Sequence, residues 1–181
     1  MALAHTILTV LMDAPFSGYD ISKQFEMGVG CFWNASQQQI YRELAKMEKQ
    51  GWVEFETVPQ DGKPDKKIYH VTADGRGELQ RWYREPSEPT AIREDLLVKV
   101  LAGAYLPSVD LINELHHRRQ CHHERLMYYQ GKAAEHQANP QPSAMQQYLY
   151  LTLRRGIRYE QAWIDWCDEV LTVLKNKQAD A

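Results

Sequence analysis

Apolar residues recur every three or four positions through most of the chain, a spacing that predicts a largely helical protein. The first such run covers residues 3 to 12, and the proline and glycine of DAPFSG end it. A second short helix is predicted from Gly18. A third begins at Asn34 or Ser36, either of which is a suitable N-cap, and it ends before Gly51.

The pattern changes after the third helix. WVEFETV and KKIYHV are rich in β-branched and aromatic residues, and PQDGKPDK between them is typical of a hairpin turn. Thr72 or Asp74 can cap a fourth helix, after which the two prolines of EPSEPT interrupt the chain. The pattern predicts a domain boundary there, with one domain over residues 1 to 85 and another over residues 90 to 178.

The second half is predicted to be entirely helical. AIREDLLVKVLAGAYL is expected to form a largely buried helix that ends at Pro107. Residues 108 to 138 and the segment after NPQP then form two long helices, each about 45 Å long at about 1.5 Å per residue. The fold class is therefore mostly α with a small β-hairpin: a winged helix-turn-helix followed by long antiparallel, coiled-coil-like helices.

A line of positions on both long helices alternates between steps of four and three, as in helices that pack along one another. On the first helix these positions are Leu115, Arg119, His122, Leu126, Tyr129, Ala133 and His136. On the second they are Met145, Leu149, Thr152, Gly156, Tyr159, Trp163, Trp166, Val170 and Val173. A pair this long cannot cover its own aromatic stripe, so a second copy of the chain is the predicted cover. The candidate dimerisation residues are Leu149, Tyr159, Trp163, Trp166 and Val170.

The composition excludes some classes of protein and partner but does not identify a function. The formal net charge of -3 gives no general attraction to phosphate, so any nucleic-acid contact must depend on a local basic patch. Cys31, Cys121 and Cys167 form no C-x-x-C pair, which disfavours a disulfide framework or a zinc finger and favours a reducing cytoplasm. The opening run MALAHTILTVLM is too short to span a bilayer, so no membrane contact is predicted.

The third helix has a polar face with sorted charges. Its apolar sector consists of Ile40, Leu44 and Met47. The opposite face carries Gln38, Arg42, Ala45 and Lys49, with Gln39 and Lys46 beside them. In a helix-turn-helix, the N-terminal side chains of the second helix contact base edges in the major groove, and glutamine and arginine suit adenine and guanine. The order of three helices, hairpin and capped fourth helix favours this interpretation over a merely solvated surface.

The chain resembles the PadR family of bacterial transcriptional regulators. The resemblance rests on GYDISKQFEMGVGCFWNASQQQIYRELAKMEKQGWVEF followed by GKPDKKIYHVTADGRGEL, and it covers residues 3 to 80. REDLLVKVLAGAYLP and the two long helices resemble longer members related to virulence activators, whose C-terminal domain dimerises. The resemblance implies a homodimer that binds an inverted repeat in double-stranded DNA and regulates transcription. It does not imply the direction of regulation; we expect a repressor that responds to a small aromatic effector.

The resemblance and the outward face of the third helix together nominate DNA-contacting residues. On the helix these are Ser36, Gln37, Gln38, Gln39, Tyr41, Arg42 and Lys46. In the wing, the hairpin that follows, they are Lys63, Lys66 and Lys67, although two aspartates dilute its positive charge. Many family members have proline where this chain has Arg42, and Gln37 and Gln38 replace a commoner small pair, so no operator sequence is implied.

Three other interpretations compete. A winged helix can bind protein instead of DNA, and the acidic residues around the wing favour that alternative. In HHRRQCHH, His117 and Cys121 lie one helical turn apart and could share a metal or act in redox sensing, although Arg118 and Arg119 would repel a cation. The stripe containing Trp163 could line an effector pocket, but core packing is favoured.

No cofactor is predicted, and phosphate-loop, G-x-S-x-G and H-E-x-x-H signatures are absent, so no enzymatic activity is predicted.

Overall fold

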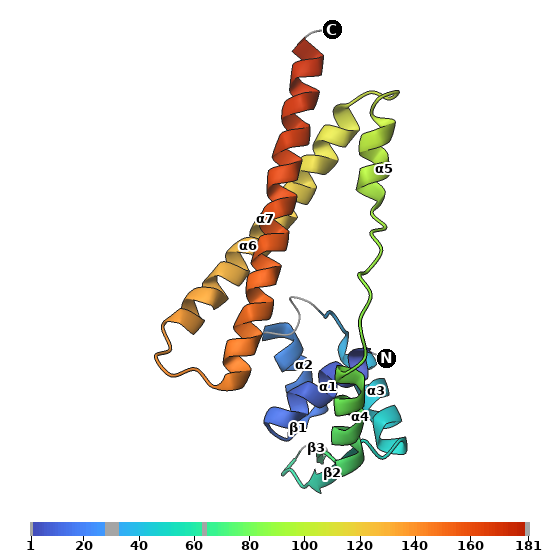
Figure 1. The fold of residues 1–181 in the computed structure, drawn as a ribbon, viewed down its shortest axis with the longest axis vertical. Helices are drawn as coiled ribbons and strands as arrows, with labels where there is room; N and C mark the ends of the chain where they lie inside the picture. Colours follow the sequence, from blue (N-terminus) through green and yellow to red (C-terminus); the bar gives the residue numbers. More distant parts are fainter. Residues whose placement is uncertain (1, 28–32, 63–64, 180–181) are drawn as a thin grey trace. The chain divides into compact units, whose positions relative to one another are not determined.

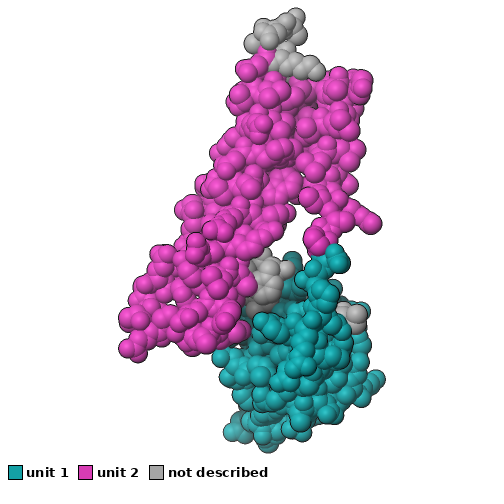
Figure 2. Space-filling model, viewed as in Figure 1, with its two compact units in different colours: residues 1–88 teal, residues 89–181 magenta. Residues whose placement is uncertain are grey.

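The computed structural model describes residues 2 to 27, 33 to 62 and 65 to 179. The chain divides into two compact units, residues 1–88 and 89–181 (Figure 2). It is mostly helical with a small antiparallel sheet, which confirms the predicted fold class (Figure 1). No helix in the described part of the chain is both long enough and apolar enough to cross a membrane.

Unit 1 contains the predicted helices and hairpin in the predicted order. Its elements are α1 (Ala2–Asp13), β1 (Phe16–Ser17), α2 (Gly18–Met27), α3 (Gln37–Lys49), β2 (Val53–Val58), β3 (Lys66–Val71) and α4 (Ala73–Tyr83). The strand order is β1-β3-β2, and both pairings are antiparallel. The sequence pattern missed β1, because two residues are too few to display a period; Phe16 lies opposite Tyr69 of β3.

The core of unit 1 lies between the first three helices and one face of the sheet. Ile7 and Leu8 of α1 and Ile21 of α2 are fully buried. The buried residues of α3 are Ile40, Leu44 and Met47, which confirms the predicted apolar sector. Burial of this sector fixes the rotation of α3 about its axis, so the polar face of α3 must point to solvent.

The start of α4 is held against the backbone that leads into β2. Thr72 is the N-cap: its hydroxyl accepts a hydrogen bond from the Gly75 N–H at 3.1 Å and donates one to the Gly51 carbonyl at 2.5 Å. The Thr72 N–H donates to the Trp52 carbonyl at 3.1 Å. Gly51 has φ 74°, the left-handed conformation that glycine adopts without strain. These bonds join α3, β2 and α4 at one point.

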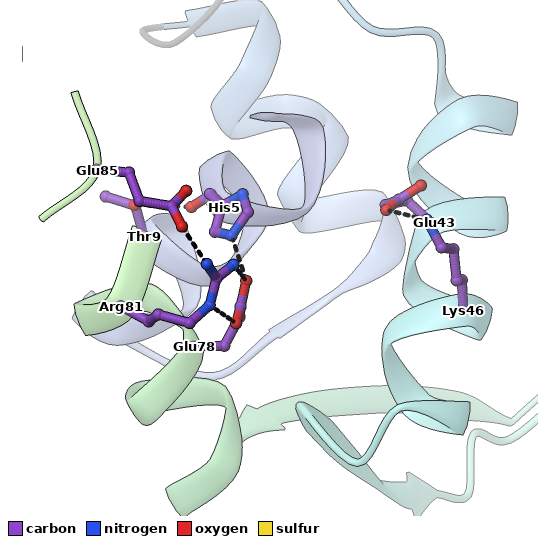
Figure 3. Close-up of polar contacts among 7 residues, drawn as sticks. All are labelled: His5, Thr9, Glu43, Lys46, Glu78, Arg81 and Glu85. Carbon is purple, nitrogen blue, oxygen red and sulfur yellow. Dashed lines mark hydrogen bonds and ion pairs between the residues drawn. The ribbon is translucent and has the colours of Figure 1, made fainter. Parts of the chain in front are cut away.

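A polar cluster centred on the buried His5 joins α1 to α4 (Figure 3). His5 Nε2 lies 2.9 Å from Glu78 Oε1, and the His5 ring stacks on Trp82 with centroids 4.5 Å apart. Arg81 donates to both oxygens of Glu78 at 2.7 Å and also pairs with Glu85. The Arg81 donors are the main reason that the pKa of Glu78 falls to about 2.

Unit 2 consists of α5 (Asp95–Ala102), α6 (Val109–Gln137) and α7 (Ala144–Ala179). The two long helices form the predicted antiparallel hairpin (Figure 1). Arg119 of α6 donates to both oxygens of Asp168 of α7, at 2.6 and 3.0 Å. Towards the hairpin turn, Gln137 donates to the Tyr150 hydroxyl at 2.9 Å.

The prediction of a largely buried helix before Pro107 is wrong. The helix spans only Asp95–Ala102, with Glu94 as its N-cap, and Leu96 is its buried residue. Val98 and Leu101 are 66% and 75% exposed. A single helix lying on a two-helix hairpin buries one side only, and the chain supplies no second layer in the described residues of unit 2.

The packing line on α7 also differs from the predicted one. The buried residues of its C-terminal half are Glu160, Ile164, Cys167, Leu171 and Leu174. Each of these buried residues comes one position after a residue of the predicted stripe. Tyr159, which belongs to the predicted stripe, is 43% exposed. Trp163, Trp166 and Val170 pack at the edge of the buried cluster. One member of this line is Glu160, which is buried as the partner of His122 and which hydrophobic periodicity cannot detect.

Candidate nucleic-acid interface

The N-terminus of α3 is closed by a capping box. The Gln39 N–H donates to Ser36 Oγ at 3.3 Å, and the Ser36 N–H donates to Gln39 Oε1 at 2.8 Å. The sequence S-x-x-Q supplies both partners, because a residue three positions after the N-cap folds back over the first turn. The box defines where α3 begins, so Gln37 is its first helical residue.

The outward face of α3 is polar and exposed. Gln37, Gln38, Arg42 and Lys46 are all exposed, and no acidic residue lies in the first turn. The side chains of Gln37, Gln38 and Arg42 form no hydrogen bond or ion pair within the described part of the chain. Lys46 lies 3.6 Å from Glu43, a long contact that solvent screens (Figure 3). A helix start with free donors and no carboxylate favours an anionic partner such as a phosphate.

Tyr41 of α3 packs against the start of α2. A Cβ added at Gly18 would lie 2.4 Å from Tyr41 Cε1, so the absence of a side chain at residue 18 leaves room for the tyrosine ring. The Tyr41 side chain nevertheless remains 44% exposed. It therefore packs on one helix and presents part of its ring to solvent.

Lys66 connects the wing to the helix-turn-helix. Its Nζ lies 3.0 Å from Asp20 Oδ2, at the start of α2. The Ser17 hydroxyl donates to the same oxygen at 2.7 Å, and this bond, followed by the contacts with Lys66, lowers the pKa of Asp20. Asp20 was missing from the predicted site, although the S-x-x-D spacing from Ser17 is a capping-box signal that could have identified it.

The other wing lysines are placed differently. Lys67 is exposed, and its Nζ lies 3.7 Å from the centroid of the Phe55 ring on β2, a cation–π contact across the hairpin. Lys63 falls outside the described residues. The structure therefore brings Lys66 close to α2, whereas Lys67 packs on the sheet.

The histidine-rich segment of α6 contains two separate environments. His117 Nε2 lies 3.7 Å from Cys121 Sγ on the exposed side. His122 faces α7 instead, where its Nδ1 lies 2.5 Å from Glu160 Oε2 and its ring stacks on Trp163 with centroids 4.9 Å apart. His122 Nε2 is buried without a hydrogen-bond partner. Within the described ranges, no group of three or more His, Cys, Asp or Glu side chains is placed to hold a metal ion.

A large apolar surface remains exposed on unit 2. On α5, on the turn after it and on the start of α6, the exposed apolar residues are Leu97, Val98, Leu101, Tyr105, Leu106 and Val109. We refer to these residues as the α5 patch. Of the candidate dimerisation residues on α7, Tyr159 is exposed, whereas Leu149, Trp163, Trp166 and Val170 are half-buried.

Comparison with known proteins agrees with the geometry of both units. The model of the transcriptional regulator PadR-like family matches residues 7–81, and that of the virulence activator alpha C-terminal domain matches residues 92–175. The chain is 38% identical to the probable transcriptional regulator Rv1176c of Mycobacterium tuberculosis, over 98% of this chain and 100% of that protein.

Solved structures resemble the whole chain as well. The virulence activator AphA of Vibrio cholerae has a TM-score of 0.83 at 35% identity, over 97% of this chain and 99% of AphA. Bacillus subtilis PadR in complex with operator DNA has a TM-score of 0.84 at 27% identity, over 95% and 97% of the two chains. PadR has also been solved with p-coumaric acid, with a TM-score of 0.79 at 26% identity over 97% and 99%.

The fold and these relatives define a winged helix-turn-helix regulator with a helical C-terminal domain, a non-enzymatic class. The chain belongs to the PadR family of transcriptional regulators.

Proposed function

We propose that this regulator is a cytoplasmic homodimer that binds an inverted-repeat operator through α3, with residues 1 to 85 as the DNA-binding domain and residues 90 to 178 as the dimerisation domain. The observation that carries the proposal is the outward face of α3, where Gln37, Gln38 and Arg42 are exposed and unpaired at a capped helix start. The operator complex of Bacillus subtilis PadR, which aligns over 95% of this chain, supports the same mode of binding.

The remaining candidate contacts have supporting roles in this proposal. Ser36, Gln39 and Tyr41 lie at the end of α3 that would enter the major groove, and Lys46 lies one turn further along, where it would approach phosphates. Lys66 and Lys67, together with Lys63, would contact the DNA backbone from the wing. Most of these contacts are independent of sequence and would hold the protein in register on the duplex.

The α5 patch and the candidate dimerisation residues of α7 support dimerisation. Neighbouring exposed apolar residues are typical of protein–protein interaction sites, which supports a contact with a second copy of the chain. In the proposed dimer, the patch packs against a second copy, and Leu149, Tyr159, Trp163, Trp166 and Val170 extend the contact along α7. Two copies of α3 would then occupy major grooves about one helical turn apart, as an inverted repeat requires.

We further propose that the protein represses transcription and that a small aromatic molecule controls it. The name of the Bacillus subtilis relative, negative transcriptional regulator PadR, supports the direction of regulation. The structure of that protein with p-coumaric acid supports an effector of this chemical class. An effector that altered the packing of the long helices would change the spacing of the two α3 helices and hence operator affinity.

Footprinting on the DNA upstream of the protein's own gene tests the proposal, followed by affinity measurements on the protected duplex. Arg42→Ala should weaken binding at least tenfold, because it removes a charged contact with a base or phosphate. Arg84→Ala is the matched control: it removes the same charge from an exposed position after α4 and should change affinity less than twofold. If Arg42→Ala binds as tightly as the control while both remain dimeric by light scattering, the assignment of α3 is wrong.

A further inference from the structure

Two pairs among the polar candidates for DNA contact at the start of α3 are not equivalent: Ser36 with Gln39, and Gln38 with Arg42. Ser36 and Gln39 are bonded to each other's backbone N–H groups in the capping box, at 3.3 and 2.8 Å. Gln38 and Arg42 form no bond with the described part of the chain. The first pair is therefore already engaged in the DNA-free protein, whereas the second pair has all its donors and acceptors free.

The engaged state of Gln39 limits what it can recognise. A glutamine that recognises adenine uses its carbonyl oxygen and its amide N–H₂ together, in one plane. In this structure Gln39 Oε1 is turned back onto the Ser36 N–H. An adenine contact would compete with the cap, so DNA binding would have to disrupt the start of the helix that carries the other contacts.

The positions of the free side chains suit base contact better. At about 100° per residue, Gln38 and Arg42 each lie about 160° around α3 from the fully buried Ile40, in opposite directions. They are four residues apart and so lie one above the other on the outward face. The pitch of about 5.4 Å spans one to two base-pair steps of about 3.4 Å, so the two side chains can contact neighbouring base pairs.

From these observations we infer that Gln38 and Arg42 determine which base pairs the protein prefers, whereas Ser36 and Gln39 are positioning residues that fix the start of α3. This inference rests on the proposed operator binding. It assigns the glutamine to an adenine-containing base pair and the arginine to a guanine-containing one, each by a bidentate contact in the major groove.

The test is a preference profile measured with full-length protein. Wild-type protein is first used to enrich its preferred duplex from a randomised double-stranded DNA pool. Affinities of each variant are then measured for that duplex and for all its single base-pair substitutions. Gln38→Ala and Arg42→Ala should each remove about tenfold discrimination at one base pair per half-site and leave the other positions unchanged.

The capping residues should behave differently. Ser36→Ala and Gln39→Ala should multiply all affinities by one common factor and preserve the order of preference, because they alter how α3 is held and not which bases it contacts. Ser36→Thr retains the hydroxyl cap and should restore wild-type affinity. That rescue distinguishes a positioning role from a general loss of folding.

The outcomes separate the inference from the function on which it rests. If Gln39→Ala changes the preference at a single base pair, or if Gln38→Ala leaves the profile unchanged, the assignment of roles is overturned while operator binding stands. If wild-type protein enriches no sequence from the pool, the proposed operator binding and the assignment both fail.

Discussion

Replacement of Gly75 with alanine tests how α4 is held against β2. A Cβ at this position would lie 2.1 Å from the Trp52 carbonyl oxygen and 3.1 Å from Val71 Cγ1. The oxygen is a backbone atom that also accepts a hydrogen bond from the Thr72 N–H at 3.1 Å. It cannot rotate away as a side chain would, so α4 itself must shift.

The expected change in the free energy of unfolding follows from a comparison of Gly75→Ala with Gly77→Ala. Overpacking of a close contact costs about 1–3 kcal/mol, whereas alanine is favoured over glycine within a helix by about 1 kcal/mol. Gly77 lies in the same helix, and a Cβ there would meet nothing within 4 Å. Gly77→Ala should therefore stabilise unit 1 by up to about 1 kcal/mol. The propensity gain is common to both variants, so their difference, about 1–3 kcal/mol, isolates the contact.

Hydrogen exchange resolved by mass spectrometry measures this difference in the full-length chain, because protection of α3 and α4 peptides reports the free energy of opening of unit 1. Gly75→Ala should lower protection relative to wild type, and Gly77→Ala should preserve or raise it. If Gly75→Ala is as protected as Gly77→Ala, the close approach of α4 to Trp52 is incorrect.

Four further predictions concern the charges and the helical hairpin. Lys66→Ala should reduce the slope of log affinity against log salt by about one if the lysine contacts phosphate, and an unchanged slope would exclude that contact. Replacement of either His122 or Glu160 by leucine should destabilise the protein by about 1–3 kcal/mol in thermal unfolding, because the remaining buried polar group loses its hydrogen-bond partner, whereas replacement of both by leucine should recover most of that loss. The folded-state pKa of Glu78 is about 2, below its ordinary 4.5, so its stabilising contribution is complete above about pH 4.5 and is lost as the pH falls towards 2. Glu78→Gln should therefore reduce the dependence of the free energy of unfolding on pH in that range. An unaltered pH profile would argue against the cluster. Trp163→Asp should produce monomers or aggregates in light scattering, and a normal dimer would remove this residue from the interface.

The local sequence was sufficient to predict the buried side of α3, because Ile40, Leu44 and Met47 repeat at helical spacing. It narrowed the N-cap to Asn34 or Ser36, and the structure assigns Ser36, which forms a capping box with Gln39. The wing and α4 were predictable for the same reason, because turn residues and a threonine cap mark their ends.

Features that depend on distant partners were not predictable in this way. The burial of Glu160 depends on a polar partner, His122, which lies 38 positions earlier in the chain, so the local pattern around Glu160 does not reveal it. The bond between Lys66 and Asp20 likewise joins the wing to α2 across a long stretch of chain. The exposure of α5 was missed because its apolar composition resembles that of a core helix, whereas the cover it needs is not provided by the described residues of unit 2.

Sequence-specific binding to DNA tests the central claim most directly. Fluorescence anisotropy would compare the affinity of wild-type protein for the footprinted duplex with that for a shuffled duplex of equal length and composition, at several salt concentrations. The proposed operator function predicts a preference of about a thousandfold or more near physiological salt, and affinity for both duplexes that falls as salt rises. Equal affinity for the two duplexes, or no binding to either, would contradict it.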